Sequence, residues 1–236
     1  MSFLKAEWRK LILANYEIES SVLEPYLPYG TELDTWQGKH YVSLVGFMFK
    51  NVRMLGLRIP FHVNFEEANL RFYVKHQTET GEWKRGVVFI KEIVPKPALS
   101  LVANTLYREH YETRIMRHIW EKQGTELKVE YAWRLDGEWQ RLGVNAKARS
   151  QAILPDSKAF FITEHYWGYT KIGPQKTYEY QVTHPSWEQY EVLDYDIQVD
   201  FSKNYGSNFA LLNDRQPASV QLAEGSAITV ERKQEL

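Results

Sequence analysis

The chain has 236 residues, with 29 basic and 30 acidic side chains and a formal net charge of −1. Proteins that bind nucleic acid through its phosphates usually carry a clear basic excess on one face, so this balance argues against a nucleic-acid or anionic-membrane partner. The absence of cysteine excludes disulfides, thiolate nucleophiles and cysteine-ligated zinc or iron–sulfur sites. No stretch approaches the roughly 18 apolar residues that span a bilayer, and the first residues lack the apolar core of a signal peptide. We therefore expect a cytoplasmic protein with no membrane partner.

A high content of aromatic residues favours a sheet-rich fold. Aromatic side chains make up 14% of the chain, including 8 Trp and 15 Tyr, and hydrophobic residues make up 44%. This is enough to fill a sizeable core, and aromatic residues are enriched in strands and in the walls of pockets. Because the chain has no linker, internal repeat or shift in composition, it is predicted to form a single domain over residues 1–236.

Strand patterns dominate the first hundred residues. After a short helix that begins near residue 20, strands are predicted at 33–36, 41–49, 64–75 and 86–94. The run 41–49 is apolar on both faces, as in a central strand. Prolines at 95 and 97 end the last of these strands. Apolar residues then recur at helical spacing, which predicts one substantial helix over residues 97–109 with Pro97 in its first turn.

The second half of the chain contains further strands. An alternating run at 129–135 precedes Asp136 and Gly137, a pair typical of a type I′ hairpin turn, and a second alternating run at 144–152 follows them. The sequence also predicts strands at 178–182, 194–200 and 227–230, a helical turn at 208–212 and a frayed tail at 231–236. Many strands, few helices and short connections predict a mainly β fold, with a closed or nearly closed antiparallel sheet.

None of the common catalytic sequence motifs is present. The chain lacks a P-loop, a GxGxxG turn, a GxSxG elbow, an HExxH helix and an EF-hand loop. Its 7 histidines are scattered, without a tight pair on one face. We therefore expect no metal site and no cofactor.

The clearest candidate site is the polar side of the strand at 64–75. Alternation places apolar residues on one face of this strand and a polar set on the other. The polar set consists of Glu67, Asn69, Arg71 and Tyr73. These side chains form either a solvated outer face with a Glu–Arg pair, or the inner lining of a barrel. In the second case Arg71 would receive a carboxylate or carbonyl oxygen of a small-molecule ligand.

Two other segments carry residues suited to a pocket. Glu92 and Lys96 lie four residues apart, so they share a face if the strand persists, and Lys96 is held between two prolines. This lysine is either an exposed residue at a strand-to-helix corner or a nucleophile activated by desolvation or by a second cation. His165 and Tyr166 lie in an aromatic stretch that forms either a pocket wall or ordinary core packing.

A wider pattern covers most of the chain. It consists of residues 23–28, 33–34 and 41–47, the spaced residues of 67–74, and the segments 86–89 and 103–111. As a whole this pattern resembles the uncharacterised YqjF-like bacterial family. That family is similar in fold to acetoacetate decarboxylase, so the resemblance implies a closed, double-walled β-cone with an internal polar pocket. In acetoacetate decarboxylase the interior holds a Schiff-base lysine.

The resemblance also implies candidate catalytic residues. The decarboxylase lysine follows a Glu-containing strand in a Tyr-Pro-Lys-Lys sequence, and the matching positions here are Glu92 and the segment from Val94 to Lys96. Lys96 would be the nucleophile and Glu92 its acid–base partner, although Pro97 stands in place of the second lysine. This analogy implies a lyase-like enzyme, which could be a homo-oligomer, acting on a small keto acid or carbonyl compound. The alternative is a non-catalytic binder of a small apolar or anionic ligand in the cone interior.

Overall fold

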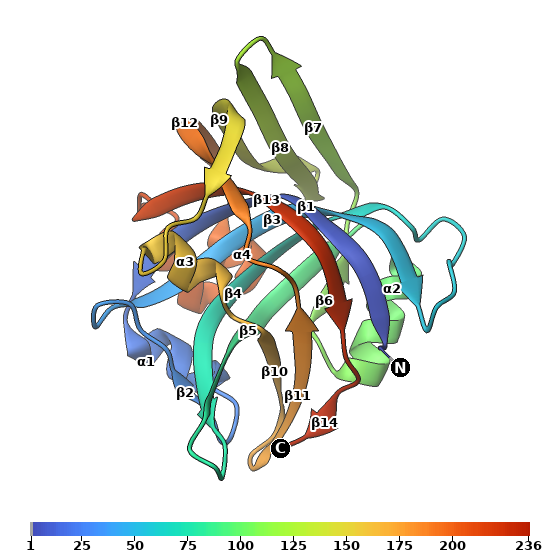
Figure 1. Cartoon of the computed structure of the whole chain (residues 1–236), viewed down its shortest axis with the longest axis vertical. Helices are drawn as coiled ribbons and strands as arrows, with labels where there is room; N and C mark the ends of the chain where they lie inside the picture. Colours follow the sequence, from blue (N-terminus) through green and yellow to red (C-terminus); the bar gives the residue numbers. More distant parts are fainter. Residues whose placement is uncertain (1) are drawn as a thin grey trace.

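The main strands form one continuous sheet that closes into a ring. A computed structural model describes residues 2–236, apart from the side chains of Leu106 and Tyr107. Each ring strand pairs with the next, and β11 pairs with β13 through Val182–Val230 and Thr183–Thr229, which closes the ring (Figure 1). In order around the ring, the strands are β11 (Lys176–Thr183), β10 (Trp167–Gly173), β5 (Trp83–Val94), β4 (Phe65–Gln77), β3 (His40–Met54), β1 (Leu4–Ile18) and β13 (Ser219–Val230).

A second group of strands, which we call the outer wall, packs against the outside of the ring. It continues from β13 and consists of β12 (Glu188–Gln198), β9 (Glu138–Ala152), β8 (Glu126–Leu135) and β7 (Met116–Gln123). Tyr131 and Trp133 of β8 are buried in one apolar cluster with the outward-facing residues of β1, β3 and β4. The predicted turn at Asp136 and Gly137 joins β8 to β9, with positive φ at both residues.

Short elements occupy the ends of the ring. β2 (Glu32–Leu33), β6 (Tyr111–Thr113) and β14 (Gln234–Glu235) pair with β4, β5 and β11. The helix predicted at 97–109 is present as α2 (Pro97–Val102), followed by one π-helical segment, η2 (Ala103–Tyr107). The remaining helices are α1 (Ser20–Leu23), η1 (Glu24–Tyr26), α3 (Lys158–Thr163), α4 (Phe201–Tyr205) and η3 (Ser207–Leu212). Among the described helices, none is both long and apolar enough to cross a membrane.

The predicted fold class is confirmed, with two differences. The sheet is mixed rather than wholly antiparallel, because β5 pairs in parallel with both β10 and β6. The prediction of a frayed tail at 231–236 was wrong. Residues of β14 pair with β11, and the backbone amides of Glu231 and Leu236 each donate to a β11 carbonyl at 2.9 Å.

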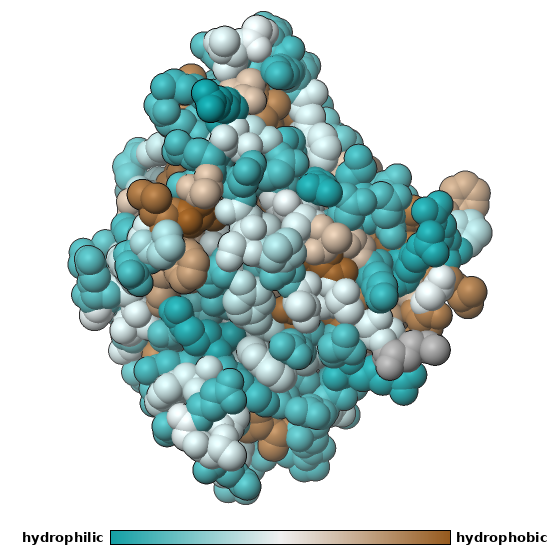
Figure 2. Space-filling model, viewed as in Figure 1, coloured by the Kyte–Doolittle hydropathy of each residue, from teal (hydrophilic) through white to brown (hydrophobic). Residues whose placement is uncertain are grey.

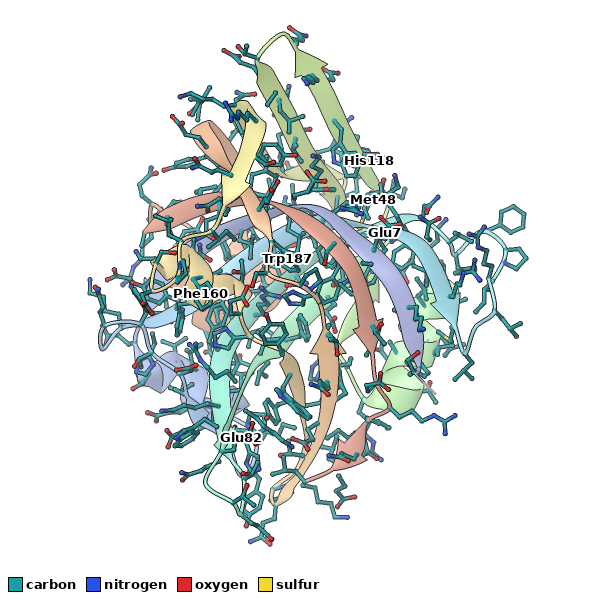
Figure 3. All side chains as sticks on the ribbon, viewed as in Figure 1. Glu7, Met48, Glu82, His118, Phe160 and Trp187 are labelled. Carbon is teal, nitrogen blue, oxygen red and sulfur yellow. The ribbon has the colours of Figure 1, made fainter. Side chains whose placement is uncertain are left out.

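Strand β4 turns its polar side into the ring. Its outward side is apolar and fully buried against the outer wall: Ala68, Leu70, Phe72 and Val74. The ring interior holds a separate apolar cluster that includes Val45, Phe47 and Trp187. In Figure 3, Trp187 lies within the molecule, whereas Glu82 of the β4–β5 turn lies at its edge. The face drawn in Figure 2 is mainly hydrophilic, with hydrophobic residues in small separate patches.

Gly46 of β3 permits the close approach of the outer wall. A Cβ atom at this position would lie 3.0 Å from Cδ2 of Tyr131 and 3.2 Å from Cδ2 of Leu142, and both side chains are fully buried. We therefore expect Gly46→Ala to lower the free energy of unfolding by about 1–3 kcal/mol through overpacking. Urea denaturation measures this change.

Gly143→Ala in β9 is the matched control for this prediction. A Cβ atom there would lie 3.7 Å from its nearest neighbours, which is ordinary van der Waals contact. Its free energy of unfolding is expected to change by less than about 1 kcal/mol. Equal losses in the two variants would mean that Gly46 is not needed for the approach of the two walls.

Candidate functional site

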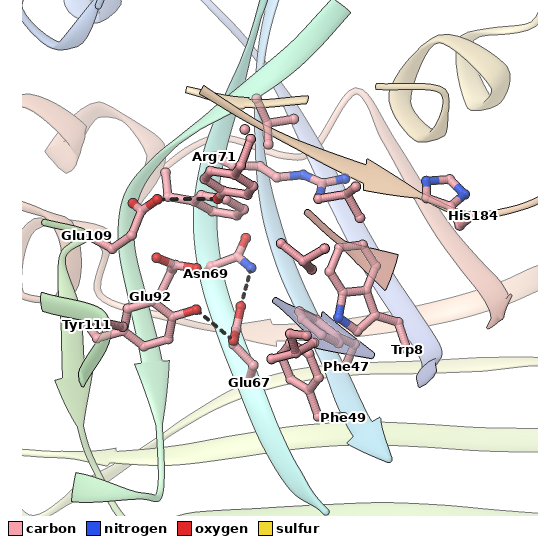
Figure 4. Close-up of a pocket in the computed structure, with 18 of the residues that line it drawn as sticks. Trp8, Phe47, Phe49, Glu67, Asn69, Arg71, Glu92, Glu109, Tyr111 and His184 are labelled. Atoms are coloured by element: carbon pink, nitrogen blue, oxygen red, sulfur yellow. Dashed lines mark hydrogen bonds between the residues drawn. The ribbon is translucent and has the colours of Figure 1, made fainter. Parts of the chain in front are cut away.

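The ring encloses a cavity with a mainly aromatic and aliphatic lining. Its volume is about 150 Å³, a size that accommodates a benzene-sized molecule in other proteins. Polar side chains enter it from β4, β5, β6 and β11, and from the segments before β6, before β10 and after β11 (Figure 4). The polar residues of the lining are Glu67, Asn69, Arg71, Glu92, Glu109, Tyr111, Thr163, His165, Tyr180 and His184.

Two carboxyl groups lie side by side on neighbouring strands of the ring. Glu67 of β4 accepts a hydrogen bond from Asn69 Nδ2 at 2.9 Å, and the hydroxyl of Tyr111 donates to its other oxygen at 3.5 Å. Glu92 of β5 is 3% exposed. Its Oε2 atom has no hydrogen-bond partner among the described residues. A buried oxygen without a partner is uncommon, and here it leaves a place for a ligand atom.

A third carboxyl group, that of Glu109, faces the same part of the cavity. The hydroxyls of Thr170 and Tyr180 donate to its Oε1 atom at 2.6 and 3.2 Å. Burial raises the pKa of Glu109 to about 7 and that of Glu67 to about 8. Burial, together with the charges of the other two carboxyl groups, raises the pKa of Glu92 well above its ordinary value. Near neutral pH Glu67 and Glu92 therefore hold protons and can donate them, whereas Glu109 is present in both its protonated and its ionised form.

Arg71 is the one arginine or lysine among the described lining residues. It is 8% exposed, and none of the described residues forms a hydrogen bond or an ion pair with its guanidinium. In Figure 4 the guanidinium extends toward His184 and away from the three carboxyl groups. A buried charge without a counter-ion is strongly unfavourable. The Arg71 end of the cavity is therefore suited to an anion.

Aromatic rings form the wall beside this cation. His184 packs against Trp187 and Tyr166, with ring centroids 4.3 and 4.7 Å apart, and Trp8 lies 6.4 Å from it. Burial lowers the pKa of His184, so its ring is neutral near pH 7. The indole Nε1 of Trp8 is a buried donor without an acceptor among the described residues. Arg71 and Trp8, which both line the cavity, thus carry hydrogen-bond donors that no described residue uses.

The structure brings together most of the site residues predicted from the sequence. Those that line the cavity are Glu67, Asn69, Arg71, Glu92 and His165. Tyr73 also faces inward, but its hydroxyl is hydrogen-bonded to Ser43 at 2.6 Å and its ring packs on His165. Tyr166 is not among the lining residues, and its hydroxyl donates to Glu164.

Lys96 lies outside this group. Strand β5 ends at Val94, and Lys96 is the N-cap residue of α2. The pKa of Glu66 lies below its ordinary value. Burial raises this pKa, but the hydrogen bond from His118 and the charge of Lys96 are among the causes that lower it further. Glu66 lies on the outward side of β4 and pairs there with His118 of the outer wall at 2.7 Å. Among the described residues that line the cavity, none is a lysine.

Sequence reasoning missed several polar residues of the lining. Glu109 and Tyr111 follow η2 and come beside Glu92 through the parallel pairing of β6 with β5. His184, Tyr180 and Trp8 are aromatic residues whose sequence context does not distinguish a pocket wall from ordinary core packing. Within the described part of the chain, no group of three His, Asp or Glu residues is arranged to hold a metal ion.

A closed, double-walled ring of strands around an interior cavity is the architecture of acetoacetate decarboxylase-like proteins, and solved structures match it. The chain is similar to the enduracididine biosynthesis enzyme MppR complexed with pyruvate, with a TM-score of 0.70 and 10% identity, covering 100% of this chain and 91% of that one. It is also similar to acetoacetate decarboxylase from Legionella pneumophila subsp. pneumophila str. Philadelphia 1, with a TM-score of 0.65, 9% identity, and coverage of 99% and 86%.

The chain belongs to the family DUF2071, described as an uncharacterized conserved protein (COG2071), whose family model matches residues 5–227. It is 27% identical over 186 residues to the uncharacterized protein YqjF of Bacillus subtilis (strain 168), covering 78% of this chain and 74% of that protein. The resemblance seen in the sequence is thereby confirmed. The structural matches establish the fold, which does not transfer an activity.

The buried carboxyl cluster predicts an unusual dependence of stability on pH. In the unfolded chain Glu67 titrates near 4.5, whereas in the folded chain its pKa is about 8. Between pH 7 and 8.5 the folded state therefore binds more protons, and the free energy of unfolding falls as the pH rises. One retained proton corresponds to about 1.4 kcal/mol per pH unit. Between pH 7 and 8.5 the free energy of unfolding of Glu67→Gln is thus expected to fall by about 1 kcal/mol less than that of the wild type.

Urea denaturation at pH 7 and 8.5 measures the difference. Glu82→Gln is the control, because Glu82 is an exposed carboxyl group in the β4–β5 turn. It should lose as much stability as the wild type. If Glu67→Gln and the wild type lose equal stability, the carboxyl group of Glu67 is already ionised in the folded chain.

Proposed function

We propose that the cavity binds a small carboxylate and that Arg71 receives its carboxylate group. The observation that carries this proposal is the buried guanidinium, which has no counter-ion among the described residues. A carboxylate fits the two-pronged donor of arginine and supplies the missing negative charge. The cavity volume of about 150 Å³ corresponds to a ligand of about six non-hydrogen atoms. The part of the ligand beyond its carboxylate packs against Phe47, Phe89 and the other aromatic rings of the lining.

The polar groups at the other end of the cavity favour a ligand that also carries a carbonyl oxygen. Glu67 and Glu92 hold protons near neutral pH, so each can donate a hydrogen bond to such an oxygen. A small 2-oxo acid combines this acceptor with the carboxylate. Similar structures include MppR complexed with pyruvate and MppR with the condensation product of pyruvate and imidazole 4-carboxaldehyde. These complexes support the choice of ligand class.

The same groups support acid–base chemistry on this ligand. A carboxyl group with a pKa near 7 or 8 is a suitable general acid at neutral pH. Formation of an imine has less support, because the described lining holds no lysine and Lys96 lies at the start of α2. The second candidate function is binding without turnover. The absence of a lysine from the described lining favours it over a decarboxylase that uses an imine.

The central prediction concerns Arg71→Met. Pyruvate, 2-oxobutyrate and benzoate are each tested by thermal shift. A ligand present at ten times its Kd stabilises the folded chain by about 1.4 kcal/mol, which raises Tm by about 3–6 °C. We expect at least one of these acids to produce such a shift in the wild type and none to produce it in Arg71→Met, because the variant loses the receptor for the anion.

Arg141→Met is the matched control, since Arg141 lies in the outer wall and pairs with Asp196 at 3.3 Å. Arg141→Met should keep the full ligand-induced rise in Tm. Pyruvamide, the uncharged analogue of pyruvate, should give no shift in any variant. A shift that survives in Arg71→Met, or that pyruvamide reproduces, would contradict the assignment of Arg71.

Reduction with borohydride separates the acid–base route from the imine route. The chain is incubated with pyruvate, treated with sodium borohydride and mapped by peptide mass spectrometry. The acid–base route leaves every lysine unmodified, whereas an imine would leave a reduced adduct on the reacting lysine. An adduct on Lys96 would support the role implied by the family resemblance and would contradict the acid–base route.

A further inference from the structure

A buried aspartate and a buried histidine form a hydrogen-bonded pair at the edge of the cavity. Asp34 follows β2, and its backbone amide donates to the carbonyl of Tyr73 at 2.9 Å. Its Oδ2 atom lies 3.1 Å from Nε2 of His165 and accepts a second bond from Nε of Arg85 at 2.7 Å. The side chain of His165 is 1% exposed. Strands β4 and β5 thus hold Asp34 through Tyr73 and Arg85, and the pair is buried away from bulk water.

The hydrogen bond fixes the tautomer of the histidine. The bonds from His165 and Arg85 lower the pKa of Asp34 despite its burial, so it is a carboxylate and only accepts. Nε2 of His165 must then carry the proton. Burial lowers the pKa of His165 to about 4, so the ring is neutral and Nδ1 bears a lone pair. Nδ1 is buried and has no partner among the described residues. An unused acceptor of this kind is unfavourable unless a ligand or water donates to it.

His165 shares the cavity with the proposed carboxylate receptor. Its ring packs on Tyr73, with centroids 4.7 Å apart, and edge-on against Phe161 at 5.1 Å, so its orientation is fixed. The charge of Arg71 reaches His165, where it is one of the causes that lower the pKa. A bound carboxylate would neutralise that charge. The lone pair would then become a better proton acceptor when the ligand is present.

We propose that Nδ1 of His165 is the proton acceptor for a ligand bound to Arg71, and that Asp34 is its positioning residue. This inference rests on the proposed function. For a 2-oxo acid, a proton leaves C3 for Nδ1 and the C–H electron pair forms a C2=C3 double bond. The carbonyl π electrons move to oxygen, which takes a proton from one of the neutral carboxyl groups of the cavity. The products are the enol, an imidazolium and a carboxylate, and the step reverses without another reactant. The Asp34 carboxylate stabilises the imidazolium.

Hydrogen–deuterium exchange of pyruvate tests the proton transfer. In D2O each reversal puts deuterium on C3, and the loss of the methyl signal is followed by ¹H NMR against a protein-free blank. His165→Gln keeps an amide donor for Asp34 and removes the Nδ1 lone pair. We expect its exchange rate to fall by about 100-fold, a size typical for loss of a general base. Its Kd for pyruvate should stay within about threefold of the wild type.

His118→Gln is the matched control. His118 also forms a histidine–carboxylate pair, with Glu66 at 2.7 Å, but it lies in the outer wall and outside the cavity lining. Its exchange rate should equal that of the wild type. Wild-type binding of pyruvate without exchange above the blank, or unchanged exchange in His165→Gln, would overturn the role of His165 alone. Failure of the wild type to bind pyruvate or any other carboxylate of the panel would instead overturn the proposed function.

The role of Asp34 has its own spectroscopic readout. With ¹⁵N-labelled histidine, wild-type His165 should give a pyridine-like shift for Nδ1 and a pyrrole-like shift for Nε2. Asp34→Asn can both donate and accept, so a second tautomer should become populated and exchange should fall at least about tenfold. Pyruvate binding by this variant verifies that it is folded. Changed ¹⁵N shifts with unchanged exchange, or unchanged shifts, would overturn the positioning role.

Discussion

The pairing of β11 with β13 closes the ring, and the chemistry of the interior depends on this closure. Burial is the largest cause of the raised pKa values of Glu67, Glu92 and Glu109, and of the lowered pKa of His165. In an open sheet these groups would be hydrated and would titrate near their ordinary values. The state of the site is therefore set by topology rather than by a local sequence motif, which explains why none of the common catalytic motifs accompanies it.

The two walls of the fold explain what alternation in β4 could and could not predict. The pattern correctly separated a polar stripe from an apolar one, because successive side chains of a strand always point to opposite faces. It could not say which stripe faces inward. That choice depends on the outer wall, which covers Ala68, Leu70 and their neighbours with residues such as Tyr131 and Trp133 from far along the chain. With the apolar side covered from outside, the polar side remains for the cavity.

Strand β1 shows a different limit of sequence reasoning. Lys10 has a positive φ, and the register with β3 shifts between Arg9 and Ile12, as in a β-bulge. The side chains that pack in the interior are therefore at even positions before the bulge, Ala6 and Trp8, and at odd positions after it, Leu11 and Leu13. Simple alternation fails across such a point, so the strand was not predicted. The hydroxyl of Tyr131 donates to the carbonyl of Lys10 at 2.9 Å, a contact that no local pattern encodes.

For the proposed ligand, the charges of the cavity favour a monoanion. Arg71 is cationic and has no counter-ion among the described residues, whereas Glu67 and Glu92 at the other end hold protons near neutral pH and Glu109 is only partly ionised. One bound carboxylate balances the charge of the interior. A second carboxylate would lie among groups that are already too poorly solvated to ionise, so a dicarboxylate would have to bind with one group protonated. A protonated amine on the ligand would be repelled by the positive charge of Arg71. The arrangement therefore selects by repulsion as well as by attraction, and it favours a ligand with one charged end and one neutral polar group.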